Sequence, residues 1–295
     1  MQSKQMRRFV FMAILLSACG TANAQHSRAM LSWQPRRLSN GSPILFQLGV
    51  KGDVESVSGE CLGHSFAFFR GTHPGAWYAL AGVPVQTPAG VYTLRITEKF
   101  ANGHAAQVEK QIRTFTAVYK KIPIRVAKQF TEPSQTQLAT ISVDKDVKEK
   151  IFSEISRQRL WSGPFNAPVS EPVSDLFGTE RVINGEVKSR HQGLDYAAPA
   201  GTPVRAVNRG VVILARPMFF EGNFIVIDHG QGLLSLYLHL SEFKVKEGDE
   251  VSGGQVIALS GGTGRATGAH LHVAIRWQGV YLDPALLLRL PIPAL

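Results

Sequence analysis

Residues 269–275 read A-H-L-H-V-A-I, an apolar run that contains His270 and His272. Apolar and β-branched neighbours favour a strand. Side chains alternate along a strand, so both imidazoles would lie on the same face. Burying two imidazoles side by side without polar partners would cost several kcal/mol. The segment therefore predicts a strand whose histidine face meets other polar groups, in a chain rich in β-structure.

A second pair of polar residues, His191 and Asp195, has the spacing H-x-x-x-D. Two imidazoles and one carboxylate are suitable protein ligands for a catalytic zinc, with water in the fourth tetrahedral position. Such a ligand set with an open position favours Zn²⁺ over Mg²⁺ or Ca²⁺. The remaining histidine of the H-x-H pair could then reach the metal-bound water, and so could His239 in Y-L-H-L. The alternative is a set of ordinary core or rim histidines with Asp195 in a turn.

The residues around these positions resemble the motifs of the lysostaphin-type (LytM-like) zinc metallopeptidases. The resemblance covers about residues 170 to 286, and its motifs occur in the expected order. One departure is Ala269, where many relatives have proline, but this change removes no ligand. The matching segments are residues 177–181, 184–185, 191–204, 222–230, 237–241, 251–257 and 263–272.

This resemblance implies roles for five residues. His191, Asp195 and His272 match the zinc ligands, and His239 and His270 match the two catalytic histidines. Zinc lowers the pKa of a bound water from about 15.7 to ~7, so that hydroxide is available to attack an amide carbonyl. The two catalytic histidines would transfer the proton or bind the developing oxyanion. The resemblance also implies a two-sheet β-fold with an open groove.

The N-terminus predicts export. Residues 1–24 have a basic start followed by an apolar run at 9–16, as in a secretory signal peptide that is too short to span a bilayer. Two processing sites compete. Residues 16–19 resemble a lipobox that would leave Cys19 lipidated, whereas 22–24 (A-N-A) resemble an ordinary cleavage site. The expected location is the periplasm or cell envelope, and the lipobox would make the protein an outer-membrane lipoprotein.

Charge and cysteine content agree with an exported protein. The formal net charge is +10, and removing the signal peptide would leave +7. Positive charge suits anionic surfaces such as cell-wall polymers or lipid headgroups. No dense basic run with interleaved aromatic residues occurs, so we do not expect a nucleic-acid partner. Cys61 would have no disulfide partner in the mature chain, and we expect it to be a small buried residue.

The chain length predicts two domains and a linker. Short strands between turn signals favour a β-sandwich at residues 28–120, and 77–84 with 90–92 resemble the immunoglobulin-like domain often found ahead of these peptidases. The linker, 121–168, has apolar residues at helical spacing within 144–160, which predicts an amphipathic helix. The peptidase domain should cover 169–290 and be nearly all β.

The resulting hypothesis is a zinc-dependent endopeptidase that hydrolyses peptide cross-links between the stems of bacterial peptidoglycan. The substrate follows from the resemblance, which implies cross-links of the D-Ala–diaminopimelate kind. Alternatives are a non-catalytic regulator that activates a cell-wall amidase, a latent enzyme held by its N-terminal half, and a toxin against glycine bridges. Arg265 could meet a substrate carboxylate or be solvated, and the phenylalanines in 217–222 could grip a peptide or tuck against the sheet.

Overall fold

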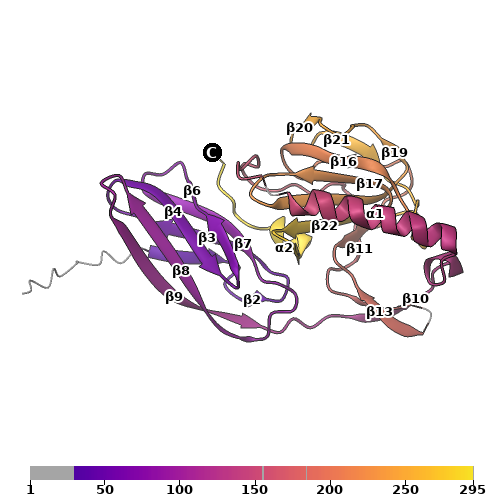
Figure 1. Ribbon diagram of the computed structural model, residues 1–295, viewed down its shortest axis with the longest axis horizontal. Helices are drawn as coiled ribbons and strands as arrows, with labels where there is room; N and C mark the ends of the chain where they lie inside the picture. Colours follow the sequence, from indigo (N-terminus) through magenta and orange to yellow (C-terminus); the bar gives the residue numbers. More distant parts are fainter. Residues whose placement is uncertain (1–29, 155, 184, 295) are drawn as a thin grey trace, which may run out of the picture.

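The computed structural model describes residues 30–154, 156–183 and 185–294. The predicted signal peptide at 1–24 and the predicted lipidation site, Cys19, lie outside the described residues. The described chain has two β-rich halves and one long helix between them in sequence (Figure 1). The predicted mainly β fold is confirmed.

The N-terminal half contains two sheets. One sheet has the strand order β1 (Met30–Gln34), β3 (Pro43–Gly49), β7 (Ala76–Gly82), β6 (Phe69–Arg70), and the other the order β2 (Leu38–Ser39), β9 (Ala105–Phe115), β8 (Gly90–Phe100), β4 (Val54–Cys61), β5 (His64–Ala67). Phe46 of the first sheet stacks on Phe66 of the second with ring centroids 5.5 Å apart. The inward-facing apolar residues of both sheets thus form one core, as in a β-sandwich.

Cys61 lies in this core with 6% of its surface exposed. Burial raises the pKa of its thiol to about 11, so the thiol is protonated at neutral pH. The prediction of a small buried residue is confirmed.

The helix between the two halves differs from the prediction. The structure has a 3₁₀ turn, η1 (Lys128–Phe130), and a helix, α1 (Gln135–Ser153). The predicted range of 144–160 was wrong at both ends. Ser134 begins the helix with a capping box, in which its side chain accepts from the backbone N–H of Gln137 and the Gln137 side chain bonds back. The helix ends where Glu154 turns to an extended conformation.

Helix α1 packs against the C-terminal half (Figure 1). Asp144 is buried, and its Oδ2 accepts a hydrogen bond of 2.7 Å from the backbone N–H of Phe219. The guanidinium of Arg276 lies 4.3 Å from the ring centre of Phe152. The helix is therefore fixed to the sheet by a polar contact near its middle and an aromatic contact near its end.

The C-terminal half consists of three sheets. The largest has the order β11 (Val173–Asp175), β14 (Leu194–Tyr196), β22 (Leu271–Trp277), β18 (Leu233–Leu240), β17 (Gly222–Asp228), β16 (Gly210–Met218), β20 (Glu250–Val251), with β23 (Val280–Leu282) paired to β22. The second is β15 (Pro203–Arg205), β21 (Val256–Leu259), β19 (Glu242–Phe243), and the third is β10 (Lys121–Ile124), β12 (Glu180–Ile183), β13 (Glu186–Arg190). A short helix, α2 (Pro284–Leu287), follows β23. The predicted linker thus supplies a strand, β10, to the C-terminal half.

The two halves share a packed interface. Phe66 of the sandwich and Trp277 of β22 have ring centroids 6.4 Å apart. The backbone N–H of Asp283 donates to the carbonyl of Gly41 over 2.8 Å. A Cβ at Gly82 would lie only 2.4 Å from Leu282. The sandwich therefore packs against the large sheet at β22 and β23, and β22 is the strand that contains His272.

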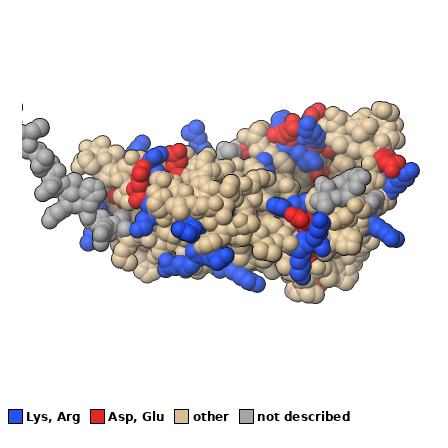
Figure 2. Space-filling model, turned by 90° about the horizontal axis from the view of Figure 1, so that it is seen from below, with Lys and Arg blue, Asp and Glu red and all other residues tan. Residues whose placement is uncertain are grey.

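Lys and Arg side chains gather along one face of the sandwich, with fewer acidic groups among them (Figure 2). This agrees with the net positive charge of the chain. Among the described residues, no helix combines the length and the apolar character needed to cross a lipid bilayer.

Candidate metal centre and catalytic groove

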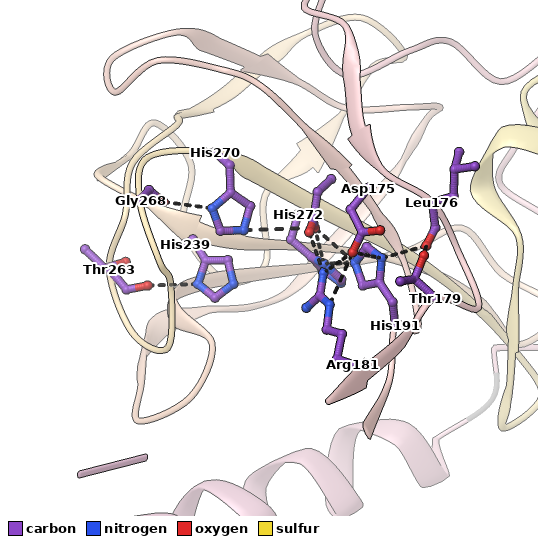
Figure 3. A network of polar contacts seen from close by, with 11 residues as sticks. Asp175, Leu176, Thr179, Arg181, His191, His239, Thr263, Gly268, His270 and His272 are labelled. Carbon is purple, nitrogen blue, oxygen red and sulfur yellow. Dashed lines mark hydrogen bonds and ion pairs between the residues drawn. The ribbon is translucent and has the colours of Figure 1, made fainter. Parts of the chain in front are cut away.

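The three predicted ligands His191, Asp195 and His272 lie together at the large sheet, and Figure 3 shows His191 next to His272. Asp195 of β14 is directly opposite His272 of β22 in the antiparallel register, and His191 lies just before β14. His191 Nε2 is 3.0 Å from Asp195 Oδ1 and 2.9 Å from His272 Nδ1. Asp195 Oδ1 is 2.7 Å from His272 Nδ1. All three side chains are buried, and their three donor atoms face a common centre.

The donor set fits a zinc ion. Two imidazoles and a carboxylate are typical of a catalytic site, in which one position stays open. His191 Nδ1 donates to the carbonyl of Leu176 over 2.9 Å, so Nε2 carries the lone pair that a metal needs. The tautomer of His191 is therefore set by a backbone group outside the centre.

Arg181 holds the other oxygen of Asp195. Its Nη2 lies 2.6 Å from Asp195 Oδ2 and 2.8 Å from Asp175 Oδ2. Burial by itself raises the pKa of the Asp195 carboxyl, but hydrogen bonds and charges from His191 and His272 outweigh it and hold the pKa well below its usual range. Asp195 is therefore ionised, with Oδ2 bound to arginine and Oδ1 directed to the centre.

Gly193, the middle residue of H-x-G-x-D, allows the close approach of this turn to β22. A Cβ at this position would lie 2.5 Å from both His272 Nε2 and the carbonyl oxygen of Val273. Any larger residue would push the turn away from β22 and separate His191 from His272.

His239 and His270 lie on the side of His272 that is away from His191 (Figure 3). Their ring centroids are 4.7 Å apart. His239 Nδ1 donates to the carbonyl of Thr263 over 2.8 Å, and His270 Nδ1 donates to that of Gly268 over 2.9 Å. Their Nε2 atoms therefore carry the lone pairs. His270 Nε2 lies 4.0 Å from Asp195 Oδ1.

The environment of His239 keeps its ring neutral. Burial lowers the pKa of His239 to about 3, and the nearby His272 and His270 act in the same direction. Its backbone has φ of 63°, which is uncommon for a residue other than glycine. Such conformations cluster at functional sites, where the surrounding contacts hold them in place.

The five predicted residues line a groove formed by two adjoining cavities. The first, of about 660 Å³, is bordered by His191, His239 and His272 and has Lys148 and Phe152 of α1 along one side. The second, of about 290 Å³, contains Asp195, His239 and His270 in its lining together with residues of β10. A peptide lying in this groove would cross the centre, with α1 on one side and β10 on the other.

The hairpin tip at 217–222 packs against the linker. Phe130 of η1 lies 5.4 Å from Phe219 and 6.3 Å from Phe220, measured between ring centroids. Phe220 also lines the first cavity. The tip is therefore tucked in, but against η1 of the linker and not against the sheet as expected, and Phe220 also borders the groove.

Several groups that orient the site were not predicted from the sequence. They are the carboxylate of Asp175 and the carbonyls of Leu176, Thr263 and Gly268. Every residue has a backbone carbonyl, so the sequence does not indicate which carbonyls orient the site. Arg181 stood in a recognised motif, but its two carboxylate partners come from β11 and β14, which only the fold brings together.

His229 lines neither cavity of the groove. Its Nδ1 donates to the carbonyl of Arg209 over 2.7 Å, and Nε2 is 2.8 Å from Ser235 Oγ. Burial lowers the pKa of His229 to about 4, against opposing effects of Arg209 and Asp228. Between pH ~4 and ~6.5 the His229 ring is therefore neutral in the folded chain and protonated in the unfolded chain.

This histidine predicts acid sensitivity. Because its folded-state pKa lies below the unfolded value, it contributes stability of about 3 kcal/mol that is present above pH ~6.5 and lost as the pH falls towards ~4. Urea unfolding at pH 7 and pH 4.5 should show that His229→Gln loses about 2 kcal/mol less on acidification than the wild type. An equal loss in both proteins would contradict this assignment.

The C-terminal half matches known proteins. Residues 189–284 match Peptidase family M23. "Peptidoglycan DD-endopeptidase ShyA" of Vibrio cholerae is 49% identical over 30% of this chain and 21% of its own length. "Peptidoglycan DD-endopeptidase ShyC" of the same organism is 41% identical over 38% of this chain and 26% of its own length. The chain thus spans about a quarter of these curated relatives.

A solved structure extends the likeness to both halves of the chain. The crystal structure of a candidate peptidase M23 from Pseudomonas aeruginosa is 28% identical to this chain. It covers 85% of this chain and 95% of its own, with a TM-score of 0.65. Residues 189–284 therefore form a peptidase M23 domain of the lysostaphin (LytM-like) type.

Proposed function

We propose that this protein is a zinc-dependent endopeptidase that hydrolyses peptide cross-links of bacterial peptidoglycan. The observation that carries the proposal is the convergence of His191, Asp195 and His272, with the Nε2 atoms of His239 and His270 beside them. A set of ligands next to two proton-transfer groups is the arrangement that metal-assisted amide hydrolysis needs. The printed names of the relatives support peptidoglycan as the substrate.

In this proposal His191 Nε2, Asp195 Oδ1 and His272 Nδ1 hold the metal. Bound there, zinc supplies Lewis acidity, which polarises an amide carbonyl and lowers the pKa of a water to ~7. Arg181 and Leu176 keep two of the ligands in place, because they bind the far atoms of Asp195 and His191. Such supporting contacts affect metal affinity by about 10–100-fold in other sites.

His239 and His270 move the protons. Both have Nδ1 bound to a carbonyl, so in the neutral form each Nε2 accepts a proton from the attacking water. The imidazolium that results becomes a donor and can pass the proton to the leaving amine. The hydrogen bonds at Nδ1 fix both rings, which reduces the reorganisation needed during the reaction.

The cell envelope is the proposed location. A peptidoglycan substrate requires export, and the basic surface of the sandwich suits an anionic wall or membrane (Figure 2). Lipidation at Cys19 remains a prediction, and the mass of the mature N-terminus would decide between the two processing sites.

A latent enzyme is the second candidate. It is favoured by the position of α1, whose Lys145, Lys148 and Phe152 line the cavity that contains His239. Lys148 also forms an ion pair with Glu221 of the hairpin tip. The regulator alternative requires a damaged site, and the complete set of five residues argues against it.

The proposed function is tested with purified cross-linked muropeptides and mass spectrometry. The mature protein should convert dimers to monomers, and the mass of the products identifies the bond that is cut. An Asp144→Ala variant, which loosens α1, would be faster than the wild type if the enzyme is latent. Absence of cleavage by both folded proteins, with zinc bound, would contradict the endopeptidase.

A further inference from the structure

Five cationic side chains line the two cavities of the groove, and Arg265 differs from the others. Four have carboxylate partners within ion-pair distance: Lys145 with Glu149, Lys148 with Glu221, Arg181 with Asp175 and Asp195, and Arg190 with Glu180. The guanidinium of Arg265 has no hydrogen bond or ion pair with any residue that the structure describes. It is also one of the few side chains that border both cavities.

The surroundings of Arg265 hold its charge in a partly dry position. Its guanidinium carbon lies 4.9 Å from the ring centre of Phe220, and the side chain is half-buried. Burial lowers the pKa of Arg265, and the charge of Arg181 adds to this, while Glu221 opposes it. A guanidinium stays protonated even so. It therefore presents five N–H donors, removed in part from water, to the space of the groove.

The backbone that carries Arg265 is rigid. Its N–H donates to the carbonyl of Phe220 over 2.8 Å. The preceding Gly264 has φ of 71°, and a Cβ there would lie 2.3 Å from the backbone nitrogen of Gly222. Thr263 in the same turn accepts the hydrogen bond from His239. One turn therefore fixes both a histidine of the site and the position of Arg265 beside it.

We propose that Arg265 binds a carboxylate of the peptide substrate close to the scissile amide, and so selects acidic peptides. A planar guanidinium matches a carboxylate with two parallel hydrogen bonds. This inference rests on the proposed function and adds to it the chemical class of the residue next to the bond. The amide that is cut would thus lie near a free acid.

Two carboxylates of a cross-linked stem could supply this group. One is the free acid on the diamino acid whose amine forms the cross-link, and the other is the carboxylate at the end of the acceptor stem. Both offer the same chemistry to Arg265, and they differ in distance from the scissile amide. Amidating one or the other in a synthetic dimer separates the two sources.

The test compares three synthetic dimers, with both acids free, with the diamino acid amidated, or with the stem terminus amidated. For the wild type we expect kcat/KM to fall about 10–100-fold when the recognised acid becomes an amide, because hydrogen bonds to charged groups are lost. Arg265→Gln should show the same loss on the dimer with both acids free. It should show no further loss on the dimer in which the recognised acid is amidated. Arg265→Lys should recover part of the activity.

Arg216→Gln is a matched control, because Arg216 is exposed on β16 and lines neither cavity. It should leave all three rates unchanged. Equal losses for Arg265→Gln on all three dimers would overturn the inference, since they would indicate a structural role for the turn. Failure of the wild type to cut any dimer would instead contradict the proposed endopeptidase.

Discussion

Asp195→Ala should abolish metal binding and lower kcat/KM for cross-linked muropeptides by roughly 10⁴-fold or more. Asp195 contributes one donor atom within 3.0 Å of both ligand histidines. Removing it leaves His191 and His272 as the remaining ligands among the described residues, which are too few for a catalytic zinc site. Metal content by elemental mass spectrometry and the rate of dimer cleavage measure the two effects on the same sample.

Two further variants show whether the effect of Asp195→Ala comes from loss of the metal ligand. Asp195→Asn keeps the shape of the side chain and a partner for Arg181, so it separates loss of the metal from loss of folding. Asp146→Ala is the control, because Asp146 is exposed on α1 and far in sequence from the centre. Retention of full metal content and activity by Asp195→Asn would contradict the role of Asp195 as a ligand.

His239→Ala and His270→Ala should give a different pattern. Neither residue belongs to the group of three converging donors, so both variants should retain the metal. Loss of a proton-transfer group should lower kcat by about 10²–10⁴-fold. Single-turnover cleavage and metal content, measured together, distinguish this pattern from that of Asp195→Ala.

The two histidines should also act as a unit. Their rings lie 4.7 Å apart and face the same centre, so the double variant should be little worse than the more damaging single one. Loss of metal in either single variant would contradict the separation of ligands from proton-transfer groups. Unchanged kcat in both would remove them from the mechanism.

Much of the site could be predicted because it depends on residue identity and strand periodicity. The H-x-H and H-x-x-x-D motifs name four of the five residues, and the alternation of side chains places His270 and His272 on one face. The orienting groups could not be predicted. His191, His239 and His270 are each fixed by a backbone carbonyl, and a carbonyl is available at every position of the chain.

The start of α1 could not be predicted from the spacing of apolar residues alone. The predicted start at residue 144 follows the apolar stripe that packs on the sheet, whereas the helix begins nine residues earlier at Gln135. In that first part Leu138 and Val143 are exposed, so no apolar stripe marks it. The S-x-x-Q capping box at Ser134 was the available signal for the start.

Residues 204–214 belong to two strands, β15 and β16, which lie in different sheets. Asn208, between them, bonds the backbone of Ser162 and Pro164 through its side chain. This turn is held by a segment more than forty residues away in the sequence, which a local sequence pattern does not reveal.

In the proposed function, cleavage of peptide cross-links depends on a metal held by His191, Asp195 and His272. The most direct measurement removes the metal from the purified protein with a chelator and titrates zinc back, while metal content and dimer cleavage are followed together. Cleavage should disappear with the metal and return in proportion to the zinc added, up to a single ion per chain. Undiminished cleavage by the metal-free protein would contradict it.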